Sequence, residues 1–299
     1  MLEINGLKEE KIIDSLNDSI YNLLLLKDGR IACCLGSNNL TIQILNLSTF
    51  KSELTLKGHY DVITSVCQID NGFLISSSID KCLCVWNIGN MKAPLEEVIF
   101  EDHYNGINKV ISLSNNRIAS CGGDGIIRIY YSNAPYTLIK SINAHKEGVI
   151  SIIQLKGKEE LISTSIDCTL IKWNLDNYQS ETMLSNVYCQ TNNSLREIKN
   201  NKIVVGGFKK IVIVNLDKYT IEKSIEDEIF RSIYSVLELR NGSIIFGAFK
   251  RKLYLYNQTD NKVSSLSTSH GNDISCLINI NENTFLSCSY DSSIIVWKY

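Results

Sequence analysis

All four histidines of this 299-residue chain occupy the same position in a repeated pattern. Each is followed 21 or 22 residues later by an aspartate, and each aspartate is followed six residues later by an aromatic residue. The four sets are His59–Asp80–Trp86, His103–Asp124–Tyr130, His145–Asp167–Trp173 and His270–Asp291–Trp297. A fixed period of this kind is the signature of a repeat architecture, so it constrains the fold more strongly than any single motif does.

Turn-forming residues recur through the whole chain, including the parts that lack these markers. Gly, Asn and Asp tolerate the positive φ angles of tight hairpins, and such sites recur about 42 residues apart, a spacing typical of four-stranded propeller blades. The seven turns are Asp28-Gly29, Asn71-Gly72, Asn115-Asn116, Lys156-Gly157, Asn200-Asn201, Asn241-Gly242 and Asn281-Glu282-Asn283. Each precedes a short apolar run whose Val and Ile residues favour strand over helix. The predicted strands are Arg30–Leu35, Phe73–Ser78, Arg117–Gly122, Leu161–Ser165, Ile203–Gly207, Ser243–Gly247 and Thr284–Ser289.

The best-preserved repeats resemble WD repeats. The resemblance rests on three stretches: Gly58-His59 through Val85-Trp86-Asn87, Ala144-His145 through Lys172-Trp173, and Ser269-His270 through Val296-Trp297. It covers essentially the whole chain, closely in four repeats and in degenerate form in three. The resemblance implies an all-β fold, a seven-bladed β-propeller of four-stranded antiparallel blades in a single domain. The expected repeats are 8–46, 51–88, 95–131, 136–175, 180–215, 220–257 and 262–299.

The N-terminal segment is expected to close the propeller ring. The last repeat ends on an inner strand at Trp297-Lys298-Tyr299, which leaves the last blade without its outer strand. We predict that residues Lys11–Leu16 supply that strand. Closure removes the exposed sheet edges that would otherwise promote aggregation.

The resemblance also implies a hydrogen-bonded set within each blade. Histidine, a strand hydroxyl, aspartate and tryptophan would be linked, and the hydroxyls would be those of Ser76, Ser120, Ser163 and Ser287. In the third repeat Tyr130 replaces the tryptophan, so the end of that network is left open. Histidine, aspartate and serine also form hydrolase triads, but a triad is one convergent site, whereas four copies in one register favour an architectural role. We therefore predict no catalytic residues and no enzyme activity.

The ten cysteines do not indicate a metal or cofactor site. Neither Cys33-Cys34 nor the alternating Cys82 and Cys84 has a second Cys or His pair at the spacing of a tetrahedral zinc site, and buried free cysteines act as small apolar residues. No metal or cofactor is expected. The N-terminus has no apolar run suited to a signal peptide and no long apolar span follows, so we predict a cytoplasmic or nuclear protein that is neither secreted nor transmembrane.

Clustered cations mark two adjacent degenerate repeats. The net charge of −2 gives no overall attraction to nucleic acid. Where the four regular repeats have an acidic turn, these two carry Phe208-Lys209-Lys210 and Phe249-Lys250-Arg251-Lys252, and Arg231 lies in the loop that enters the second. These side chains would suit a phosphopeptide, an acidic tail or a phosphoinositide headgroup. The alternative is an ordinary solvated turn.

Aromatic residues next to the repeat markers form a second candidate surface. Tyr60, Tyr104 and Tyr290 lie beside the histidines or aspartates, together with Ile79 and Ile166. Exposed aromatic anchors commonly carry protein interfaces, although these residues could equally close the end of the core.

The predicted function is a non-catalytic protein-interaction scaffold or adaptor, a monomeric propeller within a larger complex. Its partners would be other proteins, including acidic or phosphorylated segments, and no nucleic acid. One alternative is a phosphoinositide-binding propeller at a membrane surface, although the family hallmark of paired arginines followed by glycine is missing. Another is a substrate receptor of a ubiquitin ligase, although the arginine expected two residues after the repeat tryptophan is absent. No F-box, kinase, zinc-binding or coiled-coil segment is evident in the 299 residues.

Overall fold

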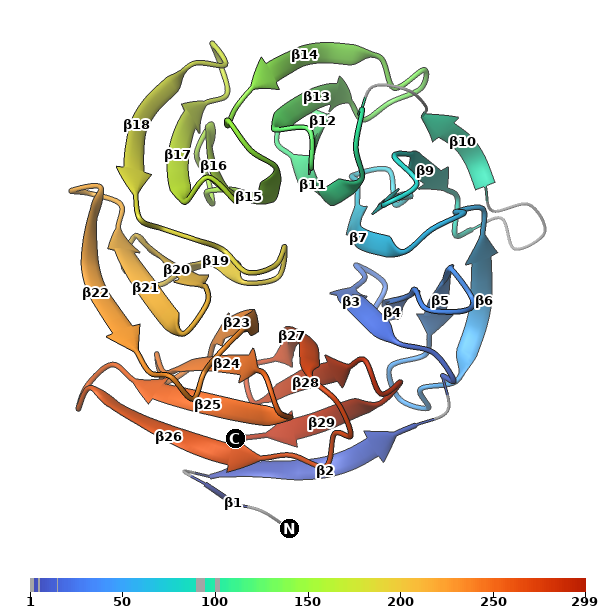
Figure 1. Cartoon of the computed structure of the whole chain (residues 1–299). Helices are drawn as coiled ribbons and strands as arrows, with labels where there is room; N and C mark the ends of the chain where they lie inside the picture. The colour runs from blue at the N-terminus through green and yellow to red at the C-terminus, as the bar shows by residue number, and fades with distance from the viewer. Residues whose placement is uncertain (1–2, 5, 15, 90–94, 100–102) are drawn as a thin grey trace.

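Seven antiparallel β-sheets are arranged radially in a ring in the computed structural model, which describes residues 3–4, 6–14, 16–89, 95–99 and 103–299 (Figure 1). Six sheets have four strands and the seventh has five. In each blade the first strand is innermost and the last lies at the outer rim (Figure 1). The predicted all-β, seven-bladed propeller is confirmed.

The first four blades follow one another along the chain. The first contains β3 (Ile20–Leu25), β4 (Ile31–Leu35), β5 (Thr41–Leu45) and β6 (Ser52–Lys57). The second contains β7 (Ile63–Gln68), β8 (Leu74–Ser78), β9 (Leu83–Trp86) and β10 (Leu95–Ile99). The third contains β11 (Ile107–Leu113), β12 (Arg117–Gly122), β13 (Ile126–Tyr131) and β14 (Leu138–Asn143). The fourth contains β15 (Val149–Gln154), β16 (Glu160–Ser165), β17 (Thr169–Asn174) and β18 (Ser180–Ser185).

The last three blades complete the ring. The fifth contains β19 (Leu195–Ile198), β20 (Lys202–Gly206), β21 (Lys210–Asn215) and β22 (Thr220–Glu226). The sixth contains β23 (Ile233–Glu238), β24 (Ile244–Ala248), β25 (Lys252–Asn257) and β26 (Lys262–Ser267). The seventh contains β27 (Ile274–Asn281), β28 (Thr284–Ser289), β29 (Ile294–Lys298), β2 (Leu7–Ile13) and β1 (Glu3–Ile4).

Burial explains why the second strand of each blade was easily predicted. Every residue of β4, β8 and β12 is buried, because neighbouring blades cover both faces of these strands. The outer strand β22, by contrast, is exposed or partly exposed along its length. The apolar core consists of clusters between neighbouring blades; Cys33 of β4, for example, packs in one cluster with Leu286 and Cys288 of β28. The blades therefore stabilise one another, as in other repeat architectures.

The turn positions predicted from the sequence connect the first and second strands. Gly29, Gly72, Gly157 and Gly242 have φ angles of 85°, 89°, 68° and 82°, which glycine adopts without the steric penalty of a Cβ atom. At two other turns, asparagine takes this role, with positive φ at Asn115-Asn116 and Asn200-Asn201. The strands that follow begin and end within one residue of their predicted bounds.

An N-terminal strand closes the ring, as predicted, but its predicted position was wrong. The strand is Leu7–Ile13 rather than Lys11–Leu16, and it pairs with β29 so that Ile13 lies opposite Ile294 and Lys8 opposite Lys298. The reason is the distance that the chain must then cover, because it crosses from the outer edge of the seventh blade to the innermost strand of the first. Leu16 belongs to that crossing and is buried there. The short strand β1 pairs with β2 at the outer edge.

No helix capable of spanning a membrane occurs in the described part of the chain.

Candidate interaction surface

The second blade shows how the repeated residues are connected. His59 Nδ1 lies 2.7 Å from an Asp80 carboxylate oxygen, and His59 Nε2 lies 2.7 Å from Ser76 Oγ. The Trp86 indole N–H donates to the same hydroxyl at 2.8 Å. His59, Ser76 and Trp86 are buried, so these contacts satisfy polar groups that water does not reach.

The fourth and seventh blades contain the same set with an additional hydroxyl. His145 Nδ1 lies 3.2 Å from Asp167 and 2.8 Å from Thr169 Oγ1. In the seventh blade His270 Nδ1 is 3.8 Å from Asp291, and Ser293 Oγ bridges the two at 2.5 and 2.6 Å. The remaining contacts repeat those of the second blade: His145 and Trp173 meet Ser163, and His270 and Trp297 meet Ser287.

The third blade contains an arginine that sequence reasoning missed. Arg128 Nη1 lies 2.8 Å from Asp124 and 2.7 Å from His103 Nδ1, and Ser120 Oγ is 2.8 Å from His103 Nε2. Arg128 is buried, and so is Tyr130, which occupies the position of the tryptophan. The sequence does contain a sign of this role, because Arg128 is the single charged residue within the otherwise apolar run Ile126–Tyr131.

Each aspartate also joins two loops. The backbone N–H of the residue after the histidine donates to the carboxylate, at 2.9 Å from Tyr60 to Asp80 and at 3.2 Å from Tyr104 to Asp124. Lys146 and Gly271 donate to Asp167 and Asp291 in the same way. The loops that enter the innermost strands are thus tied to the turns between the second and third strands of each blade. We call the surface formed by these loops and turns the histidine face.

The first blade lacks the marker residues, and its acid lies in the loop while the backbone donors lie in the turn, the reverse of the arrangement in the four blades with a histidine set. Asp18, in the loop, is buried, and its carboxylate accepts the backbone N–H groups of Ser37, Asn38 and Asn39 in the turn, at 3.1, 3.0 and 2.7 Å. Loop and turn are therefore joined although the acid lies on the other element. The sequence period could not reveal this, because Asp18 is outside the repeated register.

In the sixth blade aromatic rings replace the polar set. Phe246 lies on β24 where Ser76 lies on β8, and Tyr254 lies opposite it as Cys84 lies opposite Ser76. The rings of Phe230, Phe246 and Tyr254 are buried, with centroids between 5.0 and 5.3 Å apart. Such aromatic contacts stabilise a core without any polar group to satisfy. The first repeat thus keeps the link between loop and turn without the marker residues, and the sixth repeat replaces the polar set by aromatic packing.

The four histidine sets lie in four different blades and do not converge on one site. The geometry therefore provides no common centre at which the sets could act together on a substrate. Within the described residues no group of three or more His, Cys, Asp or Glu side chains is placed to hold a metal ion.

Burial and hydrogen bonding shift the pKa values of these groups. Burial alone would raise the pKa of Asp80, but hydrogen bonds from His59 and backbone N–H groups outweigh it and bring the pKa below its usual value. The pKa values of Asp124, Asp167 and Asp291 are lowered by the same balance. Burial lowers the pKa of His145 although Asp167 opposes that effect.

We predict that the protein loses stability in two stages as the pH falls. Because the pKa of His145 is lower when folded, the unfolded chain takes up the proton first below about pH 6.5, which favours unfolding. Because the aspartate pKa values are lower in the folded state than in the unfolded chain, the ionised aspartates stabilise the fold at pH values above the usual aspartate pKa. This contribution is lost as the pH falls below about 4. Urea unfolding at a series of pH values measures both stages; stability that increases between pH 7 and pH 5 would contradict the prediction.

Exposed apolar side chains gather on the histidine face. Tyr60 and Tyr104 are 84% and 76% exposed, and Phe208 is 53% exposed. Ile79, Ile166 and Ile229 are further exposed apolar residues of this face. The other large exposed apolar side chains of the described residues lie on or beside the outer rim: Ile12, Tyr131, Leu138, Met183, Ile221 and Val263.

Tyr290 differs from the other two predicted tyrosine anchors. Its ring packs between Tyr21 and Tyr234, with centroids 5.1 and 6.0 Å away, and burial raises the pKa of its hydroxyl. Tyr290 therefore belongs to the packed wall around the centre of the ring, whereas Tyr60 and Tyr104 project from the surface.

The structure brings the two basic clusters together around the loop 227–232. Phe208 forms a β-bridge with Ser232, and the Phe249 backbone N–H donates to the Ser232 carbonyl at 3.0 Å. The Arg231 guanidinium lies over the Phe249 ring at 5.3 Å. The exposed side chains of Lys250, Arg251 and Lys252 follow directly.

The same loop places acidic side chains among these cations. Lys209 forms an ion pair with Glu228 at 2.5 Å, and Glu226 and Asp227 line the hollow beside Phe208. The Lys210 ammonium group points to the Asn186 carbonyl, 3.2 Å away. The surface is consequently of mixed charge rather than uniformly basic.

A loop of the fifth blade occupies the centre of the ring. The connection between β18 and β19 runs inward to the middle of the propeller (Figure 1), and we call residues 190–194 the channel plug. Asn192 Nδ2 is 2.7 Å from the carbonyl oxygens of Thr64 and Asn108, and Asn193 Nδ2 is 3.1 Å from those of Tyr21 and Ser275. The plug thereby contacts four blades other than its own. A cavity of about 180 Å³ remains beside it.

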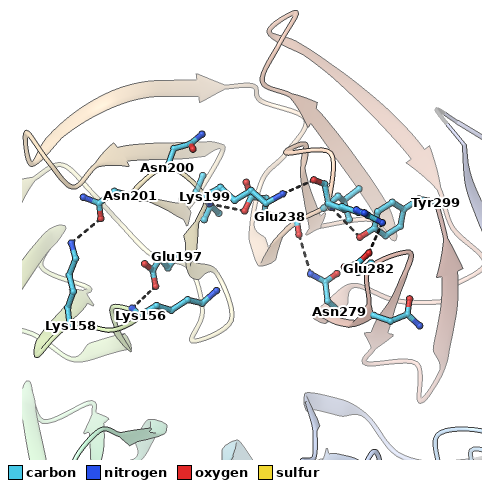
Figure 2. A pocket seen from close by; sticks show the side chains of 14 residues that line it. Lys156, Lys158, Glu197, Lys199, Asn200, Asn201, Glu238, Asn279, Glu282 and Tyr299 are labelled. Carbon is cyan, nitrogen blue, oxygen red and sulfur yellow. Dashed lines mark hydrogen bonds and ion pairs between the residues drawn. The ribbon is translucent and has the colours of Figure 1, made fainter.

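The opposite end of the propeller carries a wider groove of about 890 Å³ (Figure 2). Its charged groups are largely satisfied within the protein. Glu238 accepts the Lys199 backbone N–H at 2.9 Å, and Arg240 pairs with Glu282 at 2.6 Å, as Figure 2 shows for the surrounding residues. None of the sequence-predicted binding residues lines this groove.

Comparison with known families matches the chain to one repeat type. The model of the family "WD domain, G-beta repeat" matches residues 50–87, 96–131 and 261–298. The chain contains three WD repeats within a seven-bladed β-propeller. Each matched segment begins on or beside the outer strand of one blade and ends on or directly after the third strand of the next, so that each matched repeat connects two neighbouring blades.

Parts of the WD-repeat chain are similar to segments of larger proteins. It is 26% identical over 155 residues to the striatin homolog of Dictyostelium discoideum, covering 42% of this chain and 19% of that protein. It is 37% identical over 120 residues to the WD repeat-containing protein pop2 of Schizosaccharomyces pombe, covering 40% of this chain and 16% of that protein. It is 33% identical over 113 residues to the UDP-galactose:fucoside alpha-3-galactosyltransferase of Dictyostelium discoideum, covering 38% of this chain and 16% of that protein. The matched segments span less than a fifth of each relative, so these similarities carry over no whole-protein activity.

Proposed function

We propose that this WD-repeat propeller is a non-catalytic protein-interaction scaffold that binds a partner protein through its histidine face. WD-repeat propellers in general bind other proteins. The observation that carries the proposal is the way in which Tyr60 and Tyr104 are presented. Their rings are exposed, while their backbone N–H groups are fixed by Asp80 and Asp124.

Fixed, exposed aromatic residues are suited to anchor a partner. Such residues bury a large apolar area at an interface, and a backbone that is already ordered loses little entropy on binding. The nearby isoleucines Ile79 and Ile166 extend the apolar surface across neighbouring blades. The histidine sets therefore act indirectly, by holding the loops that carry the anchors.

The mixed-charge surface favours a protein over an anionic membrane as the ligand. Glu226, Asp227 and Glu228 would be repelled by a phosphoinositide surface. Lys250 and Arg251 are exposed and, within the described residues, form no ion pair. We propose that acidic side chains of the partner contact these two cations at the edge of the interface, where they would accelerate association and contribute to specificity.

Affinity capture from the native cell tests this proposal. The double substitution Tyr60→Ser and Tyr104→Ser should reduce recovery of partner proteins by about tenfold or more, since anchors of this kind contribute roughly 2 kcal/mol or more when truncated. A matched control is Ile221→Ser with Val263→Ser, which removes exposed apolar side chains from the outer rim. Equal losses in both variants, or undiminished capture by the tyrosine variant, would refute the proposed face.

A further inference from the structure

Two cations extend into the space enclosed by the innermost strands. Lys109 on β11 places its ammonium nitrogen 2.8 Å from the Asn192 carbonyl oxygen of the channel plug and 3.0 Å from Ser151 Oγ. Arg196 on β19 donates from Nη2 to the Leu277 carbonyl oxygen on β27 at 3.3 Å. β19 and β27 belong to the fifth and seventh blades, so this contact joins two blades that are not neighbours.

Neither cation has a compensating negative charge among the described residues. Neither forms an ion pair within the described structure, and the hydrogen-bond acceptors named above are all neutral oxygens. The adjacent Glu197 carboxylate instead accepts the Lys156 backbone N–H at 2.9 Å, on the side of the wide groove. Both side chains are partly buried, so water compensates their charges only in part, and two like charges near each other repel.

Both groups stay positive at neutral pH although burial disfavours their charge. Burial lowers the pKa of Lys109 to about 8, with a contribution from the Arg196 charge. Burial also lowers the pKa of Arg196, but arginine stays protonated in proteins.

We propose that the centre of the ring beside the channel plug binds a small multivalent oxyanion, with Lys109 and Arg196 as its charged ligands. A guanidinium group offers several N–H donors in a plane that matches phosphate or sulfate oxygens, while an ammonium group supplies a compact point charge. The Ser151 hydroxyl beside Lys109 is a further donor. The bound anion would compensate both charges and would join the third, fifth and seventh blades through the centre of the ring.

Thermal unfolding with inorganic phosphate as the probe tests this inference. The melting temperature of the wild-type protein should rise with phosphate concentration, beyond the effect of chloride at equal ionic strength, because a ligand of the folded state stabilises it. Lys109→Met should lose the phosphate-dependent increase. Without phosphate this variant should be at least as stable as wild type, since it removes a partly buried charge that has no counter-charge. Lys57→Met, a change on the exposed end of β6, is the matched control and should keep the full response.

A second measurement keeps the inference testable if Lys109→Met does not fold. Sulfate keeps its double charge across the alkaline range, so calorimetric titration of the wild-type protein with sulfate should show affinity falling as the pH rises above about 8 and Lys109 loses its proton. A wild-type protein that responds to phosphate and sulfate no more than to chloride overturns the proposal. So does an unchanged phosphate response in Lys109→Met, or a sulfate affinity that is the same at pH 7 and pH 9.5.

Discussion

Removal of residues 1–13 is expected to make the protein insoluble or to lower its melting temperature by about 10 °C or more. The deletion removes β2 and leaves the backbone of β29 as an unpaired edge, which promotes aggregation. It also exposes the core around Trp297 to which the buried Leu7 contributes. Two contacts that join β2 to the rest of the seventh repeat would be lost as well, Glu9 with Ser269 and Glu10 with Lys298.

Calorimetry of purified truncations measures this effect. Deletion of residues 1–4 removes β1 but leaves β2, and it should change the melting temperature little because β1 pairs with β2 at the outer edge. A soluble 1–13 deletion that melts at the wild-type temperature would show that the N-terminal strand does not close the ring.

Ser76→Ala should destabilise the protein by about 2–6 kcal/mol. The Ser76 hydroxyl is shared between His59 Nε2 and the Trp86 indole N–H, so its removal leaves two buried polar groups without this partner. An unsatisfied buried group costs about 1–3 kcal/mol. The loss would be far greater than the small apolar change from serine to alanine suggests.

Urea unfolding of the variant gives the free-energy difference directly. Thr55→Ala, which removes an exposed hydroxyl from the outer strand β6, is the control and should stay within about 0.5 kcal/mol of wild type. If Ser76→Ala were equally neutral, the hydroxyl would have no role in stabilising the blade.

Local chemistry determined how much of this fold could be predicted from the sequence. The hairpin turns were predictable because Gly29, Gly72 and their equivalents need positive φ angles that few residues tolerate. The strands after them were predictable because both of their faces are buried, which produces uninterrupted apolar runs. The start of β2 was not predictable, because its exposed polar residues fit a strand or a loop equally well.

The elements that shape the candidate surface depend on contacts far apart in the sequence. Asp18 was missed because its partners lie in a turn about twenty residues away. In the four blades with a histidine set the acid lies in the turn and the donor in the loop, whereas here the acid lies in the loop and the donors in the turn. The channel plug was missed because Asn192 and Asn193 read as loop residues, and only the closed ring brings four blades within reach of them. Tyr290 could not be distinguished from Tyr60 by sequence, because the rings of Tyr21 and Tyr234 that bury it come from other blades.

The loss of the histidine, aspartate and tryptophan markers has different consequences in different blades. In the sixth blade the rings of Phe230, Phe246 and Tyr254 take over the role of the polar set. The turn of that blade no longer needs an aspartate, and Lys250 stands there with its backbone N–H bonded to Asp273 of the next loop at 2.8 Å. Loss of the structural acid thus leaves a turn side chain that is free to contact a partner.

Hydrogen–deuterium exchange of the propeller, alone and with a captured partner bound, tests the proposed interaction face most directly. We predict that binding slows exchange in the loops and turns that carry Tyr60, Ile79, Tyr104 and Ile166, and leaves the turns around the wide groove at Lys199 and Arg240 unchanged. Protection confined to the wide groove or to the outer strands β22 and β26 would contradict the assignment of the histidine face as the binding surface.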